Sequence, residues 1–131
     1  MKHSAMFRWI VFPGVLAGLV LHTFIWFYLA QGGPIGFTVG FFALSVLPYL
    51  ACFLVGMRNV RGSVMAACAI PLMLLVDSFA FNEAFIAPTS STASLVLLVV
   101  PVINLAVMLI AFLVGWVAFS LHRRSTVGRA S

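Results

Sequence analysis

Four long apolar stretches constrain the fold of this chain more than any other feature of its sequence. They comprise residues 9–30, 37–56, 64–81 and 95–121. A helix needs about 20 apolar residues to cross the hydrocarbon core of a bilayer, and each stretch comes close to that length or exceeds it. Because the stretches use nearly the whole chain, no segment remains to form a water-soluble domain. We therefore predict an all-α integral membrane protein with four transmembrane helices, in which residues 1–131 form a single four-span membrane domain.

The composition agrees with this prediction. Hydrophobic residues make up 64% of the 131 residues and charged residues 7%, which is far from the composition of soluble domains. The net charge of +5 comes from basic residues dispersed in the flanks of the apolar stretches, an arrangement that favours contact with anionic lipid rather than with a nucleic acid. We expect the lipid bilayer as a partner and no nucleic acid.

The basic residues also predict the orientation of the helices. They flank the first stretch on its N-terminal side, lie between the second and third stretches, and follow the fourth; the other two connections contain none of the seven. By the positive-inside rule, both termini and the middle loop then face the cytoplasm. We expect two antiparallel hairpins with an N-in and C-in orientation in a plasma membrane, and small size and short loops suggest a bacterial inner membrane. The topology-determining residues are Lys2, Arg8, Arg58, Arg61, Arg123 and Arg124.

Turn-forming and aromatic residues suggest where the spans end. We expect outward-facing connections at residues 31–36 and 82–94 and a cytoplasmic loop at residues 57–62. Trp9 is expected at the inner interface, and Trp26 and Tyr28 at the outer interface, because amphipathic rings anchor a span at the headgroup level. The fourth stretch is overlong for one bilayer, so it must tilt, protrude or bend.

Small residues recur at four-residue spacing, which places them on one face of a helix. Such a face lets two helix backbones approach closely within a membrane. In the first stretch His22 continues the face formed by Gly14 and Gly18, and in the second stretch Ser45 and Tyr49 share a face. We expect this protein to pack its own helices, and to bind another copy or another membrane protein, through small residues. The predicted helix-packing residues are Gly14, Gly18, Gly36, Gly40, Ala111 and Gly115.

Each stretch carries one polar side chain at a similar depth. Measured from the nearest basic flank, His22, Ser45, Asp77 and Asn104 lie about 20 to 28 Å along their helices. A carboxylate near the middle of a spanning helix costs about 2.5 to 3.5 kcal/mol on insertion scales, so Asp77 needs a partner or a function. We predict that the four residues meet in the interior as a polar layer, with His22 and Asp77 as a charge pair or a neutral hydrogen-bonded pair.

Common catalytic and metal-binding arrangements are not indicated. Glu83, the second of two acidic residues, falls on a different side of its helix from Asp77, so the pair cannot act as acid and base. A hydrolase built from Ser45, His22 and Asp77 lacks a nucleophile motif and oxyanion donors. His22 is the only histidine within an apolar stretch, which leaves too few ligands for a metal or haem. We expect no enzymatic activity, no metal and no cofactor.

Two functions remain open at this point. The first is a non-catalytic accessory or oligomer-forming component of the membrane, in which the polar layer fixes the register of the helices. The second is a small proton- or ion-coupled carrier or channel, in which His22 and Asp77 exchange a proton or hold an ion.

Overall fold

The computed structural model describes residues 5, 7–29, 33–88 and 95–127, with side chains as far as His122. Every regular element in these ranges is a helix. Four helices are long and apolar enough to cross a membrane: Phe7–Leu29, Ile35–Arg58, Val60–Ile86 and Val96–His122. The prediction of an all-α chain with four long apolar helices is thereby confirmed, and the bounds differ from the predicted stretches by a few residues at most ends. Lys2 and the side chains of Arg123 and Arg124, which are predicted to determine the topology, lie outside the described residues.

Two of the four long helices are composite. The first consists of η1 (Phe7–Val11), α2 (Phe12–Phe24) and η2 (Ile25–Leu29), where η marks a π-helical segment. The second long helix is the single element α3 (Ile35–Arg58). The third is α4 (Val60–Phe81) followed directly by η3 (Asn82–Ile86), so the helix continues into the segment expected to be an outer connection. The fourth is α5 (Val96–Val127).

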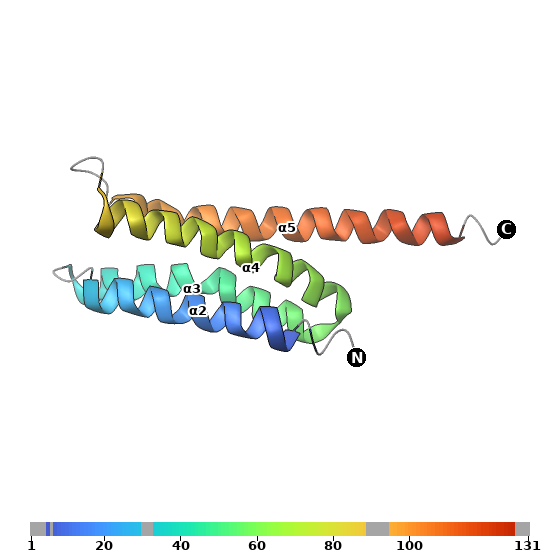
Figure 1. The fold of residues 1–131 in the computed structure, drawn as a ribbon, viewed down its shortest axis with the longest axis horizontal. Helices are drawn as coiled ribbons and strands as arrows, with labels where there is room; N and C mark the ends of the chain where they lie inside the picture. The colour runs from blue at the N-terminus through green and yellow to red at the C-terminus, as the bar shows by residue number, and fades with distance from the viewer. Residues whose placement is uncertain (1–4, 6, 30–32, 89–94, 128–131) are drawn as a thin grey trace.

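Consecutive helices run in opposite directions and form one layered bundle (Figure 1). α3 packs against α2 and α4, and α5 packs against α4 and α3. At its C-terminal end α5 extends past the other three helices (Figure 1). Its 32 residues correspond to about 48 Å, compared with about 30 Å for a hydrocarbon core. The helix is therefore longer than one hydrocarbon core, as its apolar stretch predicted.

The connection between α3 and α4 is much shorter than the expected loop at residues 57–62. Asn59 alone separates the two helices, and its side-chain oxygen accepts a hydrogen bond from the backbone N–H of Gly62 at 2.8 Å. This contact caps the first turn of α4. A Cβ at Gly62 would lie 2.1 Å from the carbonyl oxygen of Val55, so the two helix ends approach as closely as they do only because residue 62 is glycine.

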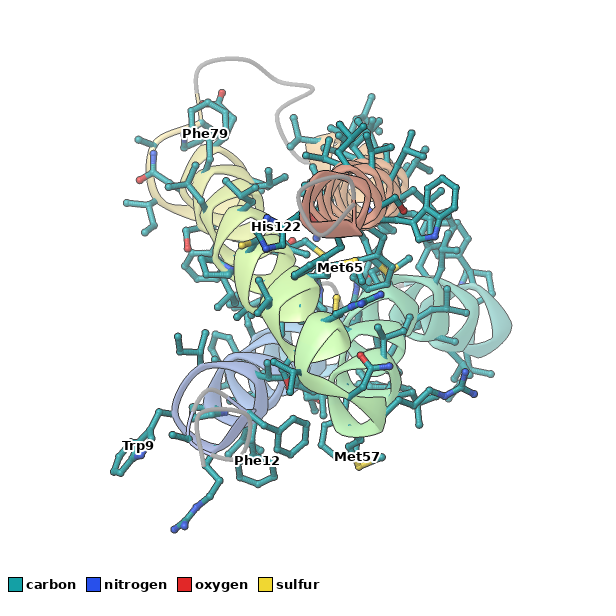
Figure 2. All side chains as sticks on the ribbon, turned by 90° about the vertical axis from the view of Figure 1, so that its right-hand side faces the viewer. Trp9, Phe12, Met57, Met65, Phe79 and His122 are labelled. Atoms are coloured by element: carbon teal, nitrogen blue, oxygen red, sulfur yellow. The ribbon has the colours of Figure 1, made fainter. Side chains whose placement is uncertain are left out.

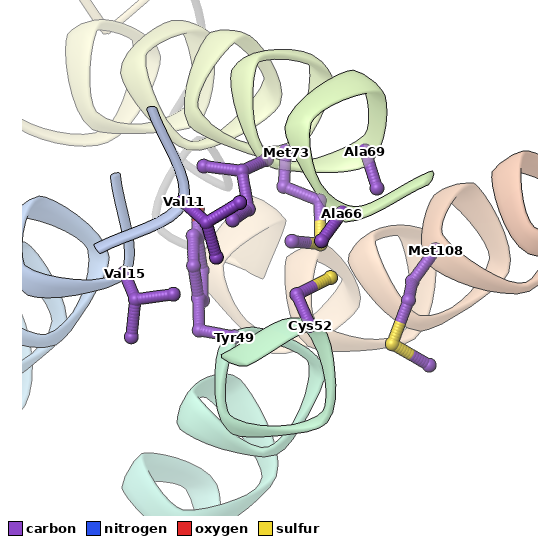
Figure 3. Close-up of a cluster of buried hydrophobic side chains, with 9 residues drawn as sticks. Val11, Val15, Tyr49, Cys52, Ala66, Ala69, Met73 and Met108 are labelled. Atoms are coloured by element: carbon purple, nitrogen blue, oxygen red, sulfur yellow. The ribbon is translucent and has the colours of Figure 1, made fainter. Parts of the chain in front are cut away.

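The interior contains two hydrophobic clusters. The larger one is drawn in Figure 3 and brings together side chains of all four long helices. The smaller one lies nearer the η2 end and consists of Ile25, Trp26 and Leu97. His22 precedes Ile25 in the chain, and Asn104 lies between Leu97 and Met108, so polar groups separate the two clusters. The buried members of the larger cluster are Val11, Val15, Tyr49, Cys52, Ala66, Ala69, Ile70, Met73 and Met108.

Several of the predicted small residues do lie where helices touch. A Cβ at Gly14 would come within 2.3 Å of Ile70 on α4, and one at Gly18 within 2.5 Å of the Tyr49 ring on α3. On α5, a Cβ at Gly115 would lie 2.5 Å from Met65. Ala111 packs against the larger cluster. These close approaches require small residues because a larger side chain would overlap its neighbour.

Gly36 and Gly40 are predicted as helix-packing residues, but neither lies against another helix in the described part of this chain. An added Cβ at either position would meet nothing within 4 Å. Large aromatic side chains fill this part of the contact between the first two long helices: Trp26 lies 5.5 Å from Phe41 and 6.5 Å from Phe37 between ring centroids. Because these rings occupy the face of α3 that meets η2, the glycine stripe faces outward.

Candidate functional site

The position of Asp77 follows from the sequence of α4. Ala66, Ala69, Met73 and Asp77 recur at helical spacing, and all four are buried. The small alanines allow this face of α4 to approach the other helices. Asp77 lies on the same face, so its carboxylate is in the interior. The side chain of Asp77 is 0% exposed. The only carboxylate of α4 is therefore hidden from the surroundings of the protein.

Each of the other three long helices supplies one hydrogen-bonding group to Asp77. From α2, Nε2 of His22 lies 3.1 Å from Oδ2. From α3, the hydroxyl of Tyr49 donates a hydrogen bond to the same oxygen. From α5, Nδ2 of Asn104 donates to Oδ1 at 2.6 Å. One carboxyl group thus connects all four long helices.

These partners allow two arrangements of protons that leave the site with no net charge. In the first, Asp77 is ionised and accepts from Tyr49, Asn104 and a protonated His22. In the second, the proton lies on Oδ2, which donates to Nε2 of a neutral His22. A proton can pass between the two groups over their 3.1 Å contact without creating a net charge in the interior. In both arrangements Nδ1 of His22 carries a hydrogen.

Two polar atoms near Asp77 have no hydrogen-bond partner among the described residues: Nδ1 of His22 and Oδ1 of Asn104. His22, but not Asn104, lines a cavity of about 10 Å³, which is roughly the smallest space that holds one water molecule. His22, Ser45 and Asp77 supply polar side chains to its wall. The lining residues are His22, Ile25, Trp26, Ser45, Asp77, Ala80, Leu97 and Val100.

Ser45 takes part in the polar layer in a different way from the other three predicted residues. Its Oγ accepts a hydrogen bond from Nε1 of Trp26 at 3.2 Å and donates one to the carbonyl oxygen of Phe41 at 2.7 Å. The structure therefore brings His22, Asp77 and Asn104 together through direct hydrogen bonds and places Ser45 on the wall of the shared cavity. Trp26 is 5% exposed, and Ser45 provides its indole N–H with a buried acceptor; its predicted depth at the outer interface stays a prediction.

Tyr49 is the member of the site that the sequence analysis missed. The spacing places Tyr49 on the same face of α3 as Ser45, but the predicted polar layer does not include it. The missed signal is the pairing of Tyr49 with Gly18. The ring occupies the space that Gly18 leaves on α2, and this position allows the hydroxyl to reach Asp77. The imidazole of His22, one turn further along α2, lies 5.8 Å from the Tyr49 ring.

The described residues contain no group of three His, Cys, Asp or Glu side chains that could hold a metal ion. The polar groups at the site are instead suited to hydrogen bonding and to proton exchange. No known protein family, curated protein or solved structure matches this chain. The chemistry of the site therefore rests on its geometry.

Proposed function

We propose that this protein is a non-catalytic component of a plasma membrane in which the Asp77 network holds four spanning helices in one arrangement. The observation that carries this proposal is the carboxyl group that receives one hydrogen-bonding partner from each of the other three long helices. Within a bilayer the hydrophobic effect does not drive helices together, so polar contacts and close packing must do so. An arrangement held in this way presents fixed outer faces to other membrane proteins or to another copy of the chain.

The N-in and C-in orientation is part of this proposal. The start of η1, the turn at Asn59 and the end of α5 lie at the same end of the bundle (Figure 1). Arg8, Arg58 and Arg61 are located at this end, which supports a cytoplasmic location by the positive-inside rule. A bacterial inner membrane fits the same rule. Reporter domains fused to the C-terminus, one active only in the cytoplasm and one active only outside it, provide the test; activity of the outside reporter contradicts the orientation.

A comparison of variants at position 77 tests the structural role. Asp77→Asn preserves the size of the side chain, its polarity and one of its two acceptor oxygens, whereas Asp77→Leu removes all polar atoms. We expect Asp77→Asn to retain the size of the wild-type assembly in mild detergent and its cross-linking pattern in membranes. We expect Asp77→Leu to alter both. A wild-type protein that is monomeric under both conditions and cross-links to no other membrane protein contradicts the accessory role.

The second candidate is a small proton-coupled carrier, which one specific observation favours. Nδ1 of His22 has no hydrogen-bond partner in the part of the chain that the structure describes, and His22 and Asp77 both line a cavity of about 10 Å³. A water molecule there would give the imidazole a second hydrogen-bonding partner and a way to exchange its proton. Flux measurements in liposomes with a pH-sensitive dye separate the two candidates. A carrier shows flux that depends on the pH gradient and is abolished by Asp77→Asn, whereas an accessory component shows none.

A further inference from the structure

A groove between α4 and α5 lies outside the Asp77 network. Its volume is about 420 Å³, within the range of about 300 to 1,000 Å³ that small-molecule sites occupy. The groove opens at the outer surface of the bundle, since Leu72 is 52% and Ile110 61% exposed. Its other walls are also apolar, with Val64 and Val107 among them. A hydrocarbon chain would therefore find matching surfaces on both helices.

Small residues of α5 create this space. Ala111 and Gly115 line the groove, and a Cβ at Gly115 would lie 2.5 Å from the side chain of Met65. Met65 lies between α4 and α5 when the bundle is viewed from the end where α5 protrudes (Figure 2). The groove is thus bounded by a flexible methionine on α4 and by two of the smallest side chains of α5.

A positive charge lies at one end of the groove. Arg61 precedes Met65 by one helical turn and Cys68 by two, so the three residues share one face of α4. The guanidinium carbon of Arg61 lies 5.6 Å from the centroid of the Phe119 ring on α5. This contact positions the cation between the two helices that form the groove. The groove is apolar along its length and has a positive charge at one end. An anionic phospholipid is complementary to it, because its acyl chain is apolar and its headgroup phosphate is negative.

We propose that this groove binds one acyl chain of an anionic phospholipid whose headgroup phosphate contacts Arg61. From Arg61 to Leu72, α4 rises about 16 Å, which matches half of a hydrocarbon core of about 30 Å. The groove and Arg61 together therefore span about the depth of a single leaflet. The guanidinium group can bind two phosphate oxygens at once. Basic residues at the cytoplasmic surface face the leaflet that is rich in anionic lipid.

Native mass spectrometry of the purified full-length chain, titrated with phosphatidylglycerol or with phosphatidylcholine, tests the proposal. We expect one phosphatidylglycerol molecule to bind about fivefold more tightly than phosphatidylcholine, since a basic residue near anionic lipid contributes an effect of that order. Arg61→Gln removes this preference. Arg58→Gln is the matched control, because Arg58 belongs to the same turn but ends α3, and it retains the preference.

A second pair of variants tests the groove without changing its charge. Ile110→Trp introduces bulk into the groove, whereas Leu109→Trp adds the same bulk at a neighbouring exposed position that does not line it. We expect Ile110→Trp to weaken phosphatidylglycerol binding severalfold and Leu109→Trp to leave it unchanged. Both positions are exposed on α5, so both variants are expected to fold with wild-type thermal stability.

Alkylation of Cys68 by N-ethylmaleimide gives an independent readout, since Cys68 is exposed and Cys52 is buried. Phosphatidylglycerol should slow the alkylation of Cys68 more than phosphatidylcholine does. Equal binding of the two lipids, or equal effects of Arg61→Gln and Arg58→Gln, overturns the proposal. Protection of Cys68 that grows with protein concentration but not with phosphatidylglycerol also overturns it, because a second copy of the chain then covers the groove.

Discussion

His22 and Asp77 lie 55 positions apart in the chain, yet Nε2 of the imidazole is 3.1 Å from Oδ2 of the carboxylate. Their side chains are 3% and 0% exposed. Both side chains are buried, so removal of Asp77 leaves Nε2 of His22 without its partner, and removal of His22 takes one of the hydrogen-bonding partners from Oδ2 of Asp77. The contact between α2 and α4 therefore depends on both residues together.

A double-mutant cycle measures this dependence. His22→Ala and Asp77→Ala are each expected to lower the free energy of unfolding, and the double variant to lower it by about 1 kcal/mol less than the sum of the two, because buried polar contacts between membrane helices contribute on that order. Reversible unfolding in detergent micelles or bicelles provides the measurement. Simple additivity would show that the two side chains contribute independently.

The matched control for this cycle is Ser78, the neighbour of Asp77. Ser78 is exposed, and its Oγ donates to the carbonyl oxygen of Leu74 on its own helix at 2.7 Å. Ser78→Ala combined with His22→Ala is expected to give additive losses. A coupling as large as that of the Asp77 pair would mean that the cycle reports a general change in α4 and not a direct contact.

The hydroxyl of Tyr49 is expected to stabilise the protein independently of its ring. Tyr49→Phe keeps the ring in the space beside Gly18 but removes the hydrogen bond to Asp77, so we expect a loss of about 1 to 2 kcal/mol in the free energy of unfolding. Tyr28 is the control, because it is 67% exposed. Tyr28→Phe should change stability by less than about 0.5 kcal/mol. Equal effects of the two substitutions would exclude a structural role for the Tyr49 hydroxyl.

The long helices were predictable from sequence because apolar length is a direct physical requirement for crossing a bilayer. Their junctions were not. The expected loop at residues 57–62 is reduced to Asn59 because a side-chain cap and the glycine at position 62 allow two helix ends to touch. The hydropathy of the sequence does not predict either contact. Hydropathy also did not predict that the third helix, expected to end at Phe81, continues to Ile86.

The site was predictable to the extent that its residues are polar in apolar surroundings. His22, Asp77 and Asn104 stand out for that reason, and depth along the helices placed them at one level. Tyr49 was left out of the polar layer because its ring also packs as an apolar group, and its sequence position does not show whether the hydroxyl reaches a polar partner. Which partner each group binds depends on the rotation of each helix, and residue spacing specifies this rotation only coarsely.

The glycines at four-residue spacing also show that residue spacing specifies helix rotation only coarsely, and they give a further prediction. Gly18→Ala adds a Cβ that would lie 2.5 to 2.7 Å from three atoms of the Tyr49 ring. The ring must move, so we expect a loss of about 1 to 3 kcal/mol in the free energy of unfolding, as in other overpacked cores. Gly40→Ala meets nothing within 4 Å and is expected to leave stability unchanged or to raise it by up to about 1 kcal/mol, because alanine favours the helix. Thermal unfolding in detergent compares them.

The exposed stripe also tests the proposed self-association. If a second copy of the chain packs on Gly36 and Gly40, Gly40→Leu should reduce the size of the assembly in detergent without lowering the stability of the monomer, because a bulky side chain separates the two backbones. Val39→Leu is the control, since Val39 is a neighbouring exposed residue that lies outside the stripe. An unchanged assembly in both variants would place any contact between copies on another face.

The last prediction concerns the turn between α3 and α4, because this turn helps to position α4, the helix that contains Asp77. A Cβ at Gly62 would lie 2.1 Å from the carbonyl oxygen of Val55 and 2.9 Å from its carbon. Both atoms belong to the backbone, so the helix ends must separate to admit even one methyl group. Asn59→Ala removes only the cap at 2.8 Å and should cost about 1 kcal/mol. Gly62→Ala should therefore lower the unfolding temperature more than Asn59→Ala, and a smaller effect would mean that the helices separate at this turn without strain.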